Sequence, residues 1–175
     1  RELLALLQPD LLLAWESGTP AHVIDELRAA GFRMEVIRTR SLDDVASALL
    51  RIGELTDQMP ASRLLAQEFR DGVAQRRKQH ADALPIRVFY LVSTHPLYTI
   101  NADHYISELI SVCGGNNIFS DLMELAPMVA VEAVIERDPE VLLAADTGQT
   151  DTFDEWQRWP QIAANRYGNL FLLPA

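Results

Sequence analysis

One uninterrupted helical stretch in the middle of the chain limits what this sequence can fold into. Residues 61–83 contain no proline and a single glycine, so they predict a helix of about six turns, roughly 30 Å long. Its apolar face is formed by Leu64, Leu65, Phe69 and Val73. Its second half is polar nearly all round, which is typical either of a helix that bridges two lobes through solvent or of a surface helix with a frayed basic end.

The segment before this helix alternates strand and helix signals. Residues 10–14 form a short apolar run and residues 33–37 alternate apolar with polar side chains, so both predict strands. Each is followed by an amphipathic stretch. The order strand–helix–strand–helix is typical of a parallel α/β sheet.

Capping residues place the ends of these two helices. Thr19 is expected to cap the first helix, with Pro20 as its first residue. Gly31 is expected to end that helix. Ser41, followed by two aspartates in the first turn, is expected to cap the second helix.

The same alternation resumes after Pro85. Strands are predicted at residues 86–92, 141–145 and 169–173, and helices at residues 103–113, 131–137 and around 152–157. The predicted fold class is therefore α/β, with two Rossmann-like α/β lobes joined by a single long helix. Residues 1–57 are expected to form the remainder of an N-terminal lobe, residues 58–84 the joining helix and residues 85–175 an incomplete C-terminal lobe.

Composition excludes several classes of protein. An apolar fraction of 49% and a charged fraction of 23% over 175 residues are values for a globular protein. No apolar run approaches the ~20 residues needed to span a bilayer. A net charge of −10 argues against nucleic acid as a partner. The single cysteine, Cys113, cannot form an internal disulfide and is expected to be a small buried residue.

The sequence lacks the motifs of common catalytic and metal sites. There is no GxSxG, Walker, GxGxxG or HExxH pattern, so no catalytic residue and no metal ligand set is predicted. The histidines are scattered without zinc-site spacing, at His22, His80, His95 and His104. His104 and Glu108, four residues apart, predict a surface pair on one helix face.

Open α/β sheets bind ligands beyond the carboxyl ends of their strands, and three loops follow predicted strands. The first contains Trp15, Glu16, Ser17 and Gly18. The indole of Trp15 has two possible roles: it stacks on a planar ligand, or it covers the edge of the core, which is the commoner role of aromatic residues.

The second loop, residues 93–99, directly follows the predicted strand 86–92. Its candidate ligand-binding residues are His95, Pro96, Leu97, Tyr98 and Thr99. The imidazole of His95 has the chemistry of an iron or cobalt ligand, although a histidine in a loop is more often solvated. The phenol of Tyr98 can bind ferric iron, although stacking or packing is the commoner role.

The third loop contains Thr147 and Gln149, which follow the predicted strand 141–145. Their small polar side chains either touch a ligand or serve as ordinary turn residues.

Four segments, in this order along the chain, resemble the cobalamin, haem and siderophore solute-binding proteins of bacterial ABC importers. LLALLQPDLLLAW is similar to the family's aLkPDLVia segment, and LISVCGGNNIFSDL to its helix followed by GGeNif.d. RDPEVLLAAD is similar to nPDvIi, and WPQIAANRYGNLFLLPA to W..ipAvk.grVy.vp. Together with the long helix, the resemblance covers essentially the whole chain.

The resemblance implies two α/β lobes joined by the helix, with the ligand between them and no catalytic step. It implies a corrinoid as the transported ligand, because the tryptophan after the PDL strand lines the corrin pocket in the periplasmic cobalamin-binding members and corresponds to Trp15. The loop from His95 to Thr99 corresponds to the ligand-facing loop of the second lobe. No cofactor is implied beyond the cobalamin or iron chelate that is carried.

The family's partners are an ABC permease and its ATPase, reached by a monomer that is periplasmic or lipid-anchored at the outer face of the cytoplasmic membrane. A surface glutamate on each lobe docks on the permease in this family. The first falls near Ala21 here, so Glu16, Asp25 and Glu26 are the candidate substitutes, and the second is expected beyond Ala175. The family pattern also extends further at both ends than this sequence.

Two alternatives remain open. The same fold can carry haem or a ferric siderophore, and haem favours Tyr98 or His95 as its axial ligand. An α/β metal-cluster protein or a stand-alone sensor domain is the alternative from another class. Metal clusters usually need several cysteine ligands, and this chain has one.

Overall fold

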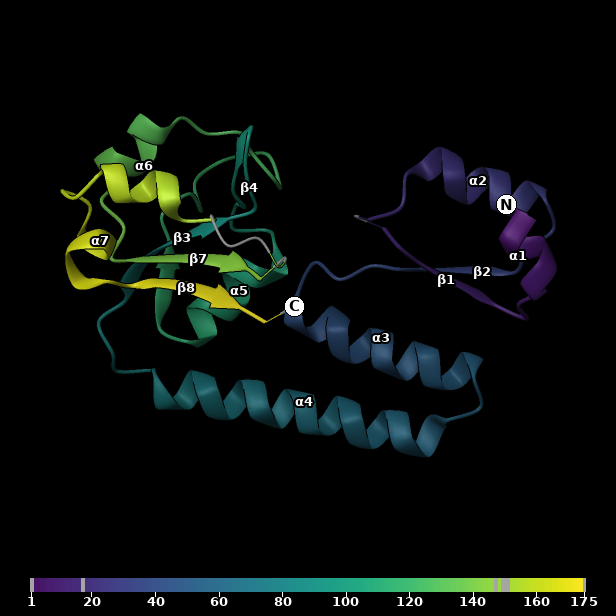
Figure 1. Ribbon diagram of the computed structural model, residues 1–175. Helices are drawn as coiled ribbons and strands as arrows, with labels where there is room; N and C mark the ends of the chain where they lie inside the picture. Colours follow the sequence, from purple (N-terminus) through teal and green to yellow (C-terminus); the bar gives the residue numbers. More distant parts are fainter. Residues whose placement is uncertain (1, 17, 147, 149–151, 175) are drawn as a thin grey trace. The chain divides into compact units, whose positions relative to one another are not determined.

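A computed structural model describes residues 2–16, 18–146, 148 and 152–174. The chain divides into two compact units, Arg1–Gln67 and Glu68–Ala175. The division falls within the long predicted helix, which is present as α4 (Met59–Gln79) (Figure 1). Both units combine helices with parallel strands, which confirms the predicted α/β fold class.

The first unit is built on a small parallel sheet. Strands β1 (Leu12–Trp15) and β2 (Met34–Ile37) pair from Leu12 opposite Met34 to Trp15 opposite Ile37. The helices of this unit are α1 (Glu2–Leu7), α2 (Ala21–Ala29), α3 (Leu42–Leu55) and the first part of α4. Both strands therefore end at the same edge of the sheet.

Helix α2 ends as predicted and begins differently. Gly31 has a φ of 89°, a conformation that glycine adopts without steric cost. The N–H of Gly31 donates to the carbonyl of Arg28, and the N–H of Phe32 to that of Leu27, which completes a Schellman motif. The prediction that Thr19 caps the helix is wrong, because Pro20 occupies the N-cap and the helix starts one residue later.

Helix α3 begins with a capping box, as the sequence predicted for Ser41. The N–H of Asp44 donates to Ser41 Oγ (3.1 Å), and the N–H of Ser41 donates to Asp44 Oδ2 (2.9 Å). The backbone N–H groups of Ser41 and then Arg40 hold the pKa of Asp44 below its usual range. Because the folded-state pKa is lowered, this contribution to stability is present above the usual carboxyl range and is lost as the pH falls through the folded pKa.

We expect Ser41→Ala to lower the free energy of unfolding by about 1 kcal/mol, since one helix N–H loses its partner. Ser47→Ala is the matched control, because Ser47 is exposed in the middle of the same helix, where alanine is the better helix former. Chemical denaturation of both variants checks the prediction. Equal stability of the two variants would contradict it.

Helices α3 and α4 approach closely through small residues. A Cβ atom added to Gly53 would lie 1.9 Å from Ser62 Oγ, so only glycine fits there. The residues that α4 buries are Ser62 and Ala66. Leu64 and Leu65, on the apolar face of the helix, are 60% and 51% exposed, because the close contact with α3 is made by the small side chains instead.

The second unit contains a four-stranded parallel sheet in the order β6-β3-β7-β8. Its strands are β3 (Ile86–Leu91), β6 (Gly115–Asn117), β7 (Val141–Ala145) and β8 (Leu170–Leu173). Its helical elements are α5 (Tyr105–Val112), α6 (Val131–Arg137), the 3-10 helix η1 (Asp154–Arg158) and α7 (Ala163–Tyr167). A short antiparallel hairpin, β4 (Ser93–Thr94) and β5 (Leu97–Tyr98), follows β3.

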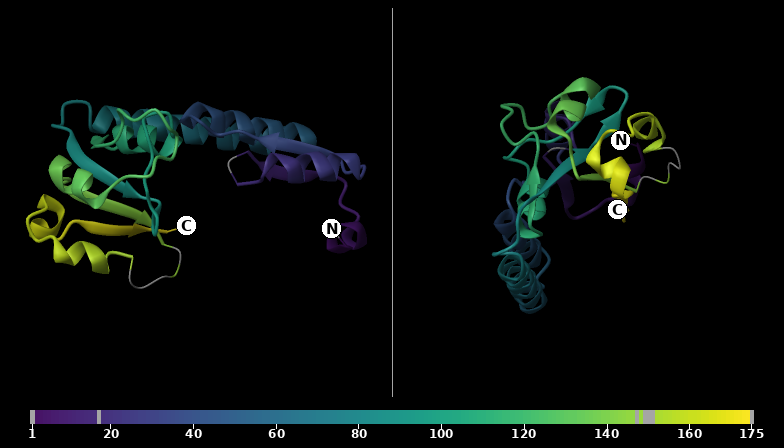
Figure 2. Two further views of the ribbon diagram at one scale, coloured as in Figure 1. Left: turned by 90° about the horizontal axis from the view of Figure 1, so that it is seen from above. Right: turned by 90° about the vertical axis from the view of Figure 1, so that its left-hand side faces the viewer.

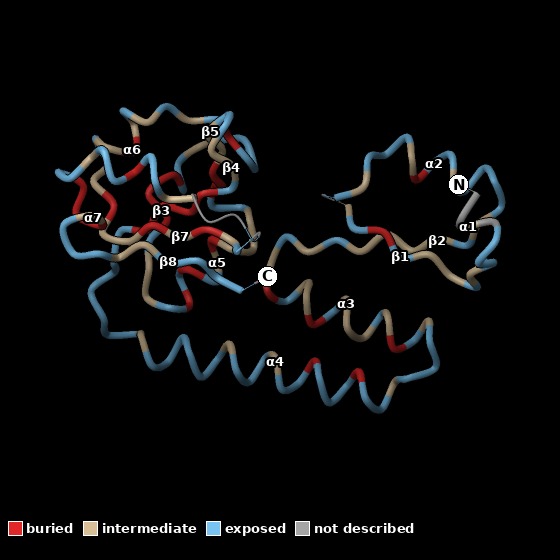
Figure 3. The backbone as a smooth tube through the Cα atoms, viewed as in Figure 1, coloured by how far each residue is buried: buried red, intermediate tan, exposed pale blue. Residues whose placement is uncertain are grey.

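Both faces of this sheet are covered. Alternate residues of β3 point to opposite sides, with Val88 and Tyr90 packing toward Ile110 of α5. Phe89 and Leu91 pack into the larger core, which includes residues of α6, η1 and α7. The positions of α5 and α7 on either side of the sheet can be followed in Figure 2, and the buried residues of β3 and β7 in Figure 3.

One further expectation from the sequence is corrected in this unit. Cys113 is exposed, because it is the C-cap residue of α5. His104 is the N-cap of the same helix, where Nδ1 accepts from the N–H of Ile106 (3.2 Å), and burial lowers its pKa. Glu108 forms an ion pair with Arg77 of α4 (3.3 Å), a partner that was not predicted.

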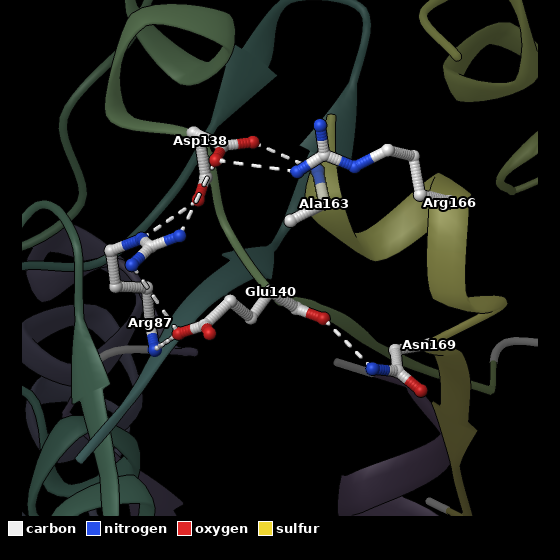
Figure 4. A network of polar contacts seen from close by, with 6 residues as sticks. All are labelled: Arg87, Asp138, Glu140, Ala163, Arg166 and Asn169. Carbon is white, nitrogen blue, oxygen red and sulfur yellow. Dashed lines mark hydrogen bonds and ion pairs between the residues drawn. The ribbon is translucent and has the colours of Figure 1, made fainter. Parts of the chain in front are cut away.

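A polar network fastens the amino ends of the strands in this unit (Figure 4). Asp138, with a φ of 43°, accepts from the N–H of Ala163 (2.8 Å) and from Nη2 of Arg87 (3.3 Å). The N–H of Arg87 donates to Glu140 Oε2 (2.9 Å), and Asn169 Nδ2 donates to the carbonyl of Glu140 (3.1 Å). The carboxyl ends of the strands, where ligands bind in such sheets, lie away from this network.

We expect Asp138→Ala to lower the free energy of unfolding by about 1–3 kcal/mol, because it removes charged hydrogen bonds and leaves a less suitable residue at positive φ. Denaturant unfolding measures the change, with Asp82→Ala as a control for the loss of one exposed carboxylate. Ligand affinity is expected to stay unchanged, and a loss of affinity as large as the loss of stability would contradict this assignment.

Candidate functional site

Trp15 lies at the carboxyl end of β1. The residue is 48% exposed, so it is only partly covered by the rest of the unit. The backbone around it is fixed: the N–H of Glu16 donates to the carbonyl of Ile37 (3.0 Å), and those of Gly18 and Thr19 to the carbonyl of Trp15. Ser17, the remaining predicted residue of this loop, lies outside the described residues. The loop offers a flat aromatic surface on a rigid base.

Charged side chains surround the end of this small sheet. Glu16 Oε1 lies 2.9 Å from Nε of Arg38, and Glu16 Oε2 lies 3.4 Å from Nη2 of Arg40. These arginines were not predicted as site residues from the sequence. The signal was present, because they follow the predicted strand 33–37 directly and parallel strands end at one edge.

The hairpin β4–β5 presents the second predicted loop at the carboxyl end of β3. His95 and Pro96, at its tip, are exposed, whereas Leu97 and Tyr98 are half-buried. Thr99 is fully buried, and its Oγ1 donates to the carbonyl of Tyr90 (2.7 Å). Thr99 therefore holds the loop in place, and the ligand-binding role of this loop stays a prediction.

Buried asparagines support this hairpin from below. Asn117 Nδ2 donates to the carbonyl of Ile100 and to Ser107 Oγ (both 2.8 Å). Asn101 Nδ2 donates to the carbonyl of Leu122 (3.1 Å). Buried amides with satisfied hydrogen bonds fix one backbone arrangement. The residues next to the hairpin are therefore rigid, whereas its tip is exposed.

A pocket of about 160 Å³ lies between the hairpin and η1. It is lined by Thr94 and Leu97 of the hairpin, by Val131 of α6, and by Glu155, Arg158 and Trp159 at η1. Nε2 of His95 lies 3.4 Å from Oε2 of Glu155 across its rim. The η1 residues were not predicted from the sequence, because nothing in the spacing of a short 3-10 helix marks it as a pocket wall.

A second segment runs beside the hairpin and was also not predicted. The N–H of Thr99 donates to the carbonyl of Pro127 (3.1 Å), and the N–H of Val129 donates to that of Leu97 (3.0 Å). Met128, which forms an antiparallel bridge with Tyr98, is 66% exposed. This segment adds a soft apolar side chain to the surface around the loop.

The remaining predicted site residues lie on α2, after β1 or outside the described residues. Thr147 and Gln149 lie outside the described residues. Asp25 and Glu26 are exposed on α2, and Glu16 is engaged with arginines. Their roles in permease docking stay predictions.

Neither a metal centre nor a membrane-spanning helix is found in the described part of the chain. No three or more histidine, cysteine, aspartate and glutamate side chains in the described ranges are grouped so that they can hold a metal ion. Among the helices described, none is long and apolar enough to cross a membrane.

Each of the two α/β units places loops at the carboxyl ends of parallel strands, the position where open α/β sheets bind ligands. The model of the periplasmic binding protein family matches residues 1–175 of this chain. The chain therefore belongs to the periplasmic binding protein family, whose members bind solutes and are not enzymes. The resemblance seen in the sequence is thereby confirmed.

Vitamin B12-binding proteins from two bacteria are similar to this chain over most of its length. The vitamin B12-binding protein of Vibrio cholerae is 32% identical over 158 residues, which are 90% of this chain and 57% of that protein. The vitamin B12-binding protein of Yersinia pestis is 34% identical over 146 residues, 83% of this chain and 52% of that protein. The chain thus spans little more than half the length of these relatives.

Solved structures agree on the fold. The periplasmic vitamin B12-binding protein of Vibrio cholerae superposes with a TM-score of 0.79 at 30% identity, covering 98% of this chain and 68% of that one. A periplasmic heme-binding protein from Roseiflexus sp. RS-1 superposes with a TM-score of 0.85 at 21% identity, covering 99% and 70%. At that identity the second likeness shows the fold alone, which is the predicted two-lobed α/β architecture.

Proposed function

We propose that this chain belongs to the substrate-binding component of an ABC importer, which captures a corrinoid in the periplasm and delivers it to a membrane permease and its ATPase. The observation that carries the proposal is the half-exposed Trp15 at the carboxyl end of β1. It occurs in a chain that is 32% identical to a vitamin B12-binding protein. An open indole on a rigid strand end suits a large planar ligand.

The hairpin in the second unit supplies a further ligand-facing surface under this proposal. His95, Pro96, Leu97 and Tyr98 are open at least in part, and Thr99 supports them. Ligand sites combine apolar and aromatic walls with a few polar groups, and this loop has both. We include Thr147 and Gln149 in the proposed site on the basis of the sequence alone.

Docking on the permease is proposed for acidic side chains of the first unit. Asp25 and Glu26 are exposed on α2, and Glu16 precedes that helix. We further propose the sequence-based assignment of residues 1–57 and 85–175 to the lobes and of residues 58–84 to the helix that connects them. We expect the protein to act as a monomer, without nucleic acid as a partner.

Haem or a ferric siderophore is the second candidate ligand. Two side chains at the hairpin favour it: the imidazole of His95 is exposed, and the phenol of Tyr98 is partly open beside it. Either is a chemically suitable axial ligand for haem iron. Haem bound in this way would give a Soret band that moves when Tyr98 or His95 is replaced.

Titration of the full-length protein with cyanocobalamin, haemin and ferric siderophores, followed by tryptophan fluorescence, tests the proposed function. Saturable quenching by cyanocobalamin alone supports a corrinoid ligand. A response to haemin or to a ferric chelate retains the transport role with a different ligand. Absence of binding to all of them would contradict the proposal.

A further inference from the structure

A pair of arginines lies at the ligand-binding edge of the sheet in the first unit. Strand β1 ends at Trp15 and strand β2 at Ile37, and these residues are partners in the parallel register. Glu16 follows one strand, and Arg38 and Arg40 follow the other. All of these side chains therefore come from one edge of one small sheet, together with the half-exposed indole.

The arginines are held in position while most of each side chain faces solvent. Arg38 Nε contacts Glu16 Oε1 (2.9 Å) and Arg40 Nη2 contacts Glu16 Oε2 (3.4 Å), yet the side chains are 71% and 72% exposed. The backbone N–H of Arg40 donates to Asp44 Oδ2 (2.9 Å), which fixes its main chain at the start of α3. A guanidinium carries five N–H donors, so a single carboxylate shared by both groups leaves much of their donor capacity unused.

The local charge differs in sign from that of the whole chain. Two guanidinium groups face one glutamate at this edge, whereas the chain has a net charge of −10. Asp44, the other carboxylate next to Arg40, is committed to backbone N–H groups. An acidic protein repels anionic solutes, and a local cationic edge offsets that repulsion where binding occurs.

We propose that Arg38 and Arg40 form an anion-binding subsite at the same sheet edge as Trp15, and that the captured solute is a planar macrocycle bearing an anionic oxygen group. The subsite rests on the proposed function. The indole takes the flat face of the ring system, and the arginines take a carboxylate or phosphodiester on its periphery. Planar guanidinium groups match the geometry of such groups and bind them with two parallel hydrogen bonds.

The test compares macrocycles with and without their anionic groups. Haemin, which carries propionates, is paired with its dimethyl ester, and cyanocobalamin, which carries a phosphodiester, with dicyanocobinamide, which lacks it. Affinities are measured for the full-length protein and for Arg38→Gln and Arg40→Gln. Arg33→Gln is the matched control, because Arg33 is exposed directly before β2, at the opposite end of the same strand.

For whichever pair of compounds binds, Arg38→Gln and Arg40→Gln are each expected to lower the affinity for the anionic compound by about tenfold. The affinity for the compound without the anionic group is expected to change by less than about twofold. Arg33→Gln is expected to change the affinity for either compound by less than about twofold. Glu16→Gln is a second test that keeps both arginines, and it is expected to strengthen binding of the anionic member, because it removes the competing carboxylate.

Equal effects on both members of a pair, or none on either, would overturn the subsite while the proposed function stands, since the unchanged protein still binds. No binding of any macrocycle by the unchanged protein would overturn both. If the substitutions weaken the binding of haemin, the recognised group is a carboxylate. If they weaken the binding of cyanocobalamin, the recognised group is the phosphodiester.

Discussion

Replacing Trp15 with alanine is expected to weaken binding of the macrocycle roughly thirtyfold, which corresponds to about 2 kcal/mol. The reason is that the substitution removes an aromatic surface that is already open and already positioned at the end of β1. Because the side chain is half-exposed, little core packing is lost, and the far-ultraviolet circular dichroism and melting temperature should stay close to those of the unchanged protein. Isothermal titration of the full-length protein measures the affinity.

Two variants make this test specific. Trp15→Phe keeps a flat aromatic ring and is expected to retain most of the affinity. Tyr167→Ala removes an aromatic side chain that is 71% exposed on α7, away from the carboxyl ends of the strands, and is expected to leave binding unchanged. Unaltered affinity of Trp15→Ala for every macrocycle that the unchanged protein binds would remove Trp15 from the site.

The largest effect on stability is expected for Phe89→Ala, at about 3–5 kcal/mol. Phe89 is fully buried in the middle of β3, with its ring centroid 5.7 Å from that of Phe119 and 5.3 Å from that of Trp156. Alanine leaves a cavity in the larger core of the second unit and removes both aromatic contacts. Unfolding in guanidinium chloride, followed separately for each of the two units, measures the loss in the free energy of unfolding.

Phe171→Ala is the matched control for this prediction. Phe171 lies on the edge strand β8 with its side chain 48% exposed, so its removal is expected to cost less than about 1 kcal/mol. If the two phenylalanine variants were equally stable, Phe89 would not be the centre of this core. Trp156 also borders the pocket beside the hairpin, so Phe89→Ala is expected to weaken ligand binding as well.

Elements with strong local signals were predictable from the sequence. The helix 131–137 and the strand 141–145 have the predicted bounds, because an apolar run and a proline mark them clearly. Gly31 and Ser41 act as predicted, since capping depends on the chemistry of single residues. By contrast, β6 has the sequence Gly-Asn-Asn, which carries no apolar alternation, and its place in the sheet comes from tertiary packing.

Contacts between separate elements of the fold were not predictable from the sequence. Leu64 and Leu65 have the character of core residues, yet the close contact between Gly53 and Ser62 decides which face of α4 is buried. The hydroxyl of Thr99 donates to a carbonyl of β3, a partner that the sequence did not indicate. Local pattern does not reveal such partners, because they lie in other elements of the fold.

The hairpin β4–β5 separates the residues that hold the loop from the residues that the loop presents. Thr99 and Asn101 are buried and hydrogen-bonded, while His95 and Pro96 at the tip are exposed. Substitutions at the tip are therefore expected to have little effect on the hydrogen bonds of Thr99 and Asn101. A library randomised at these exposed positions should yield mostly folded variants, so the hairpin is a suitable starting point for redirecting the protein toward other solutes or for building a fluorescent sensor.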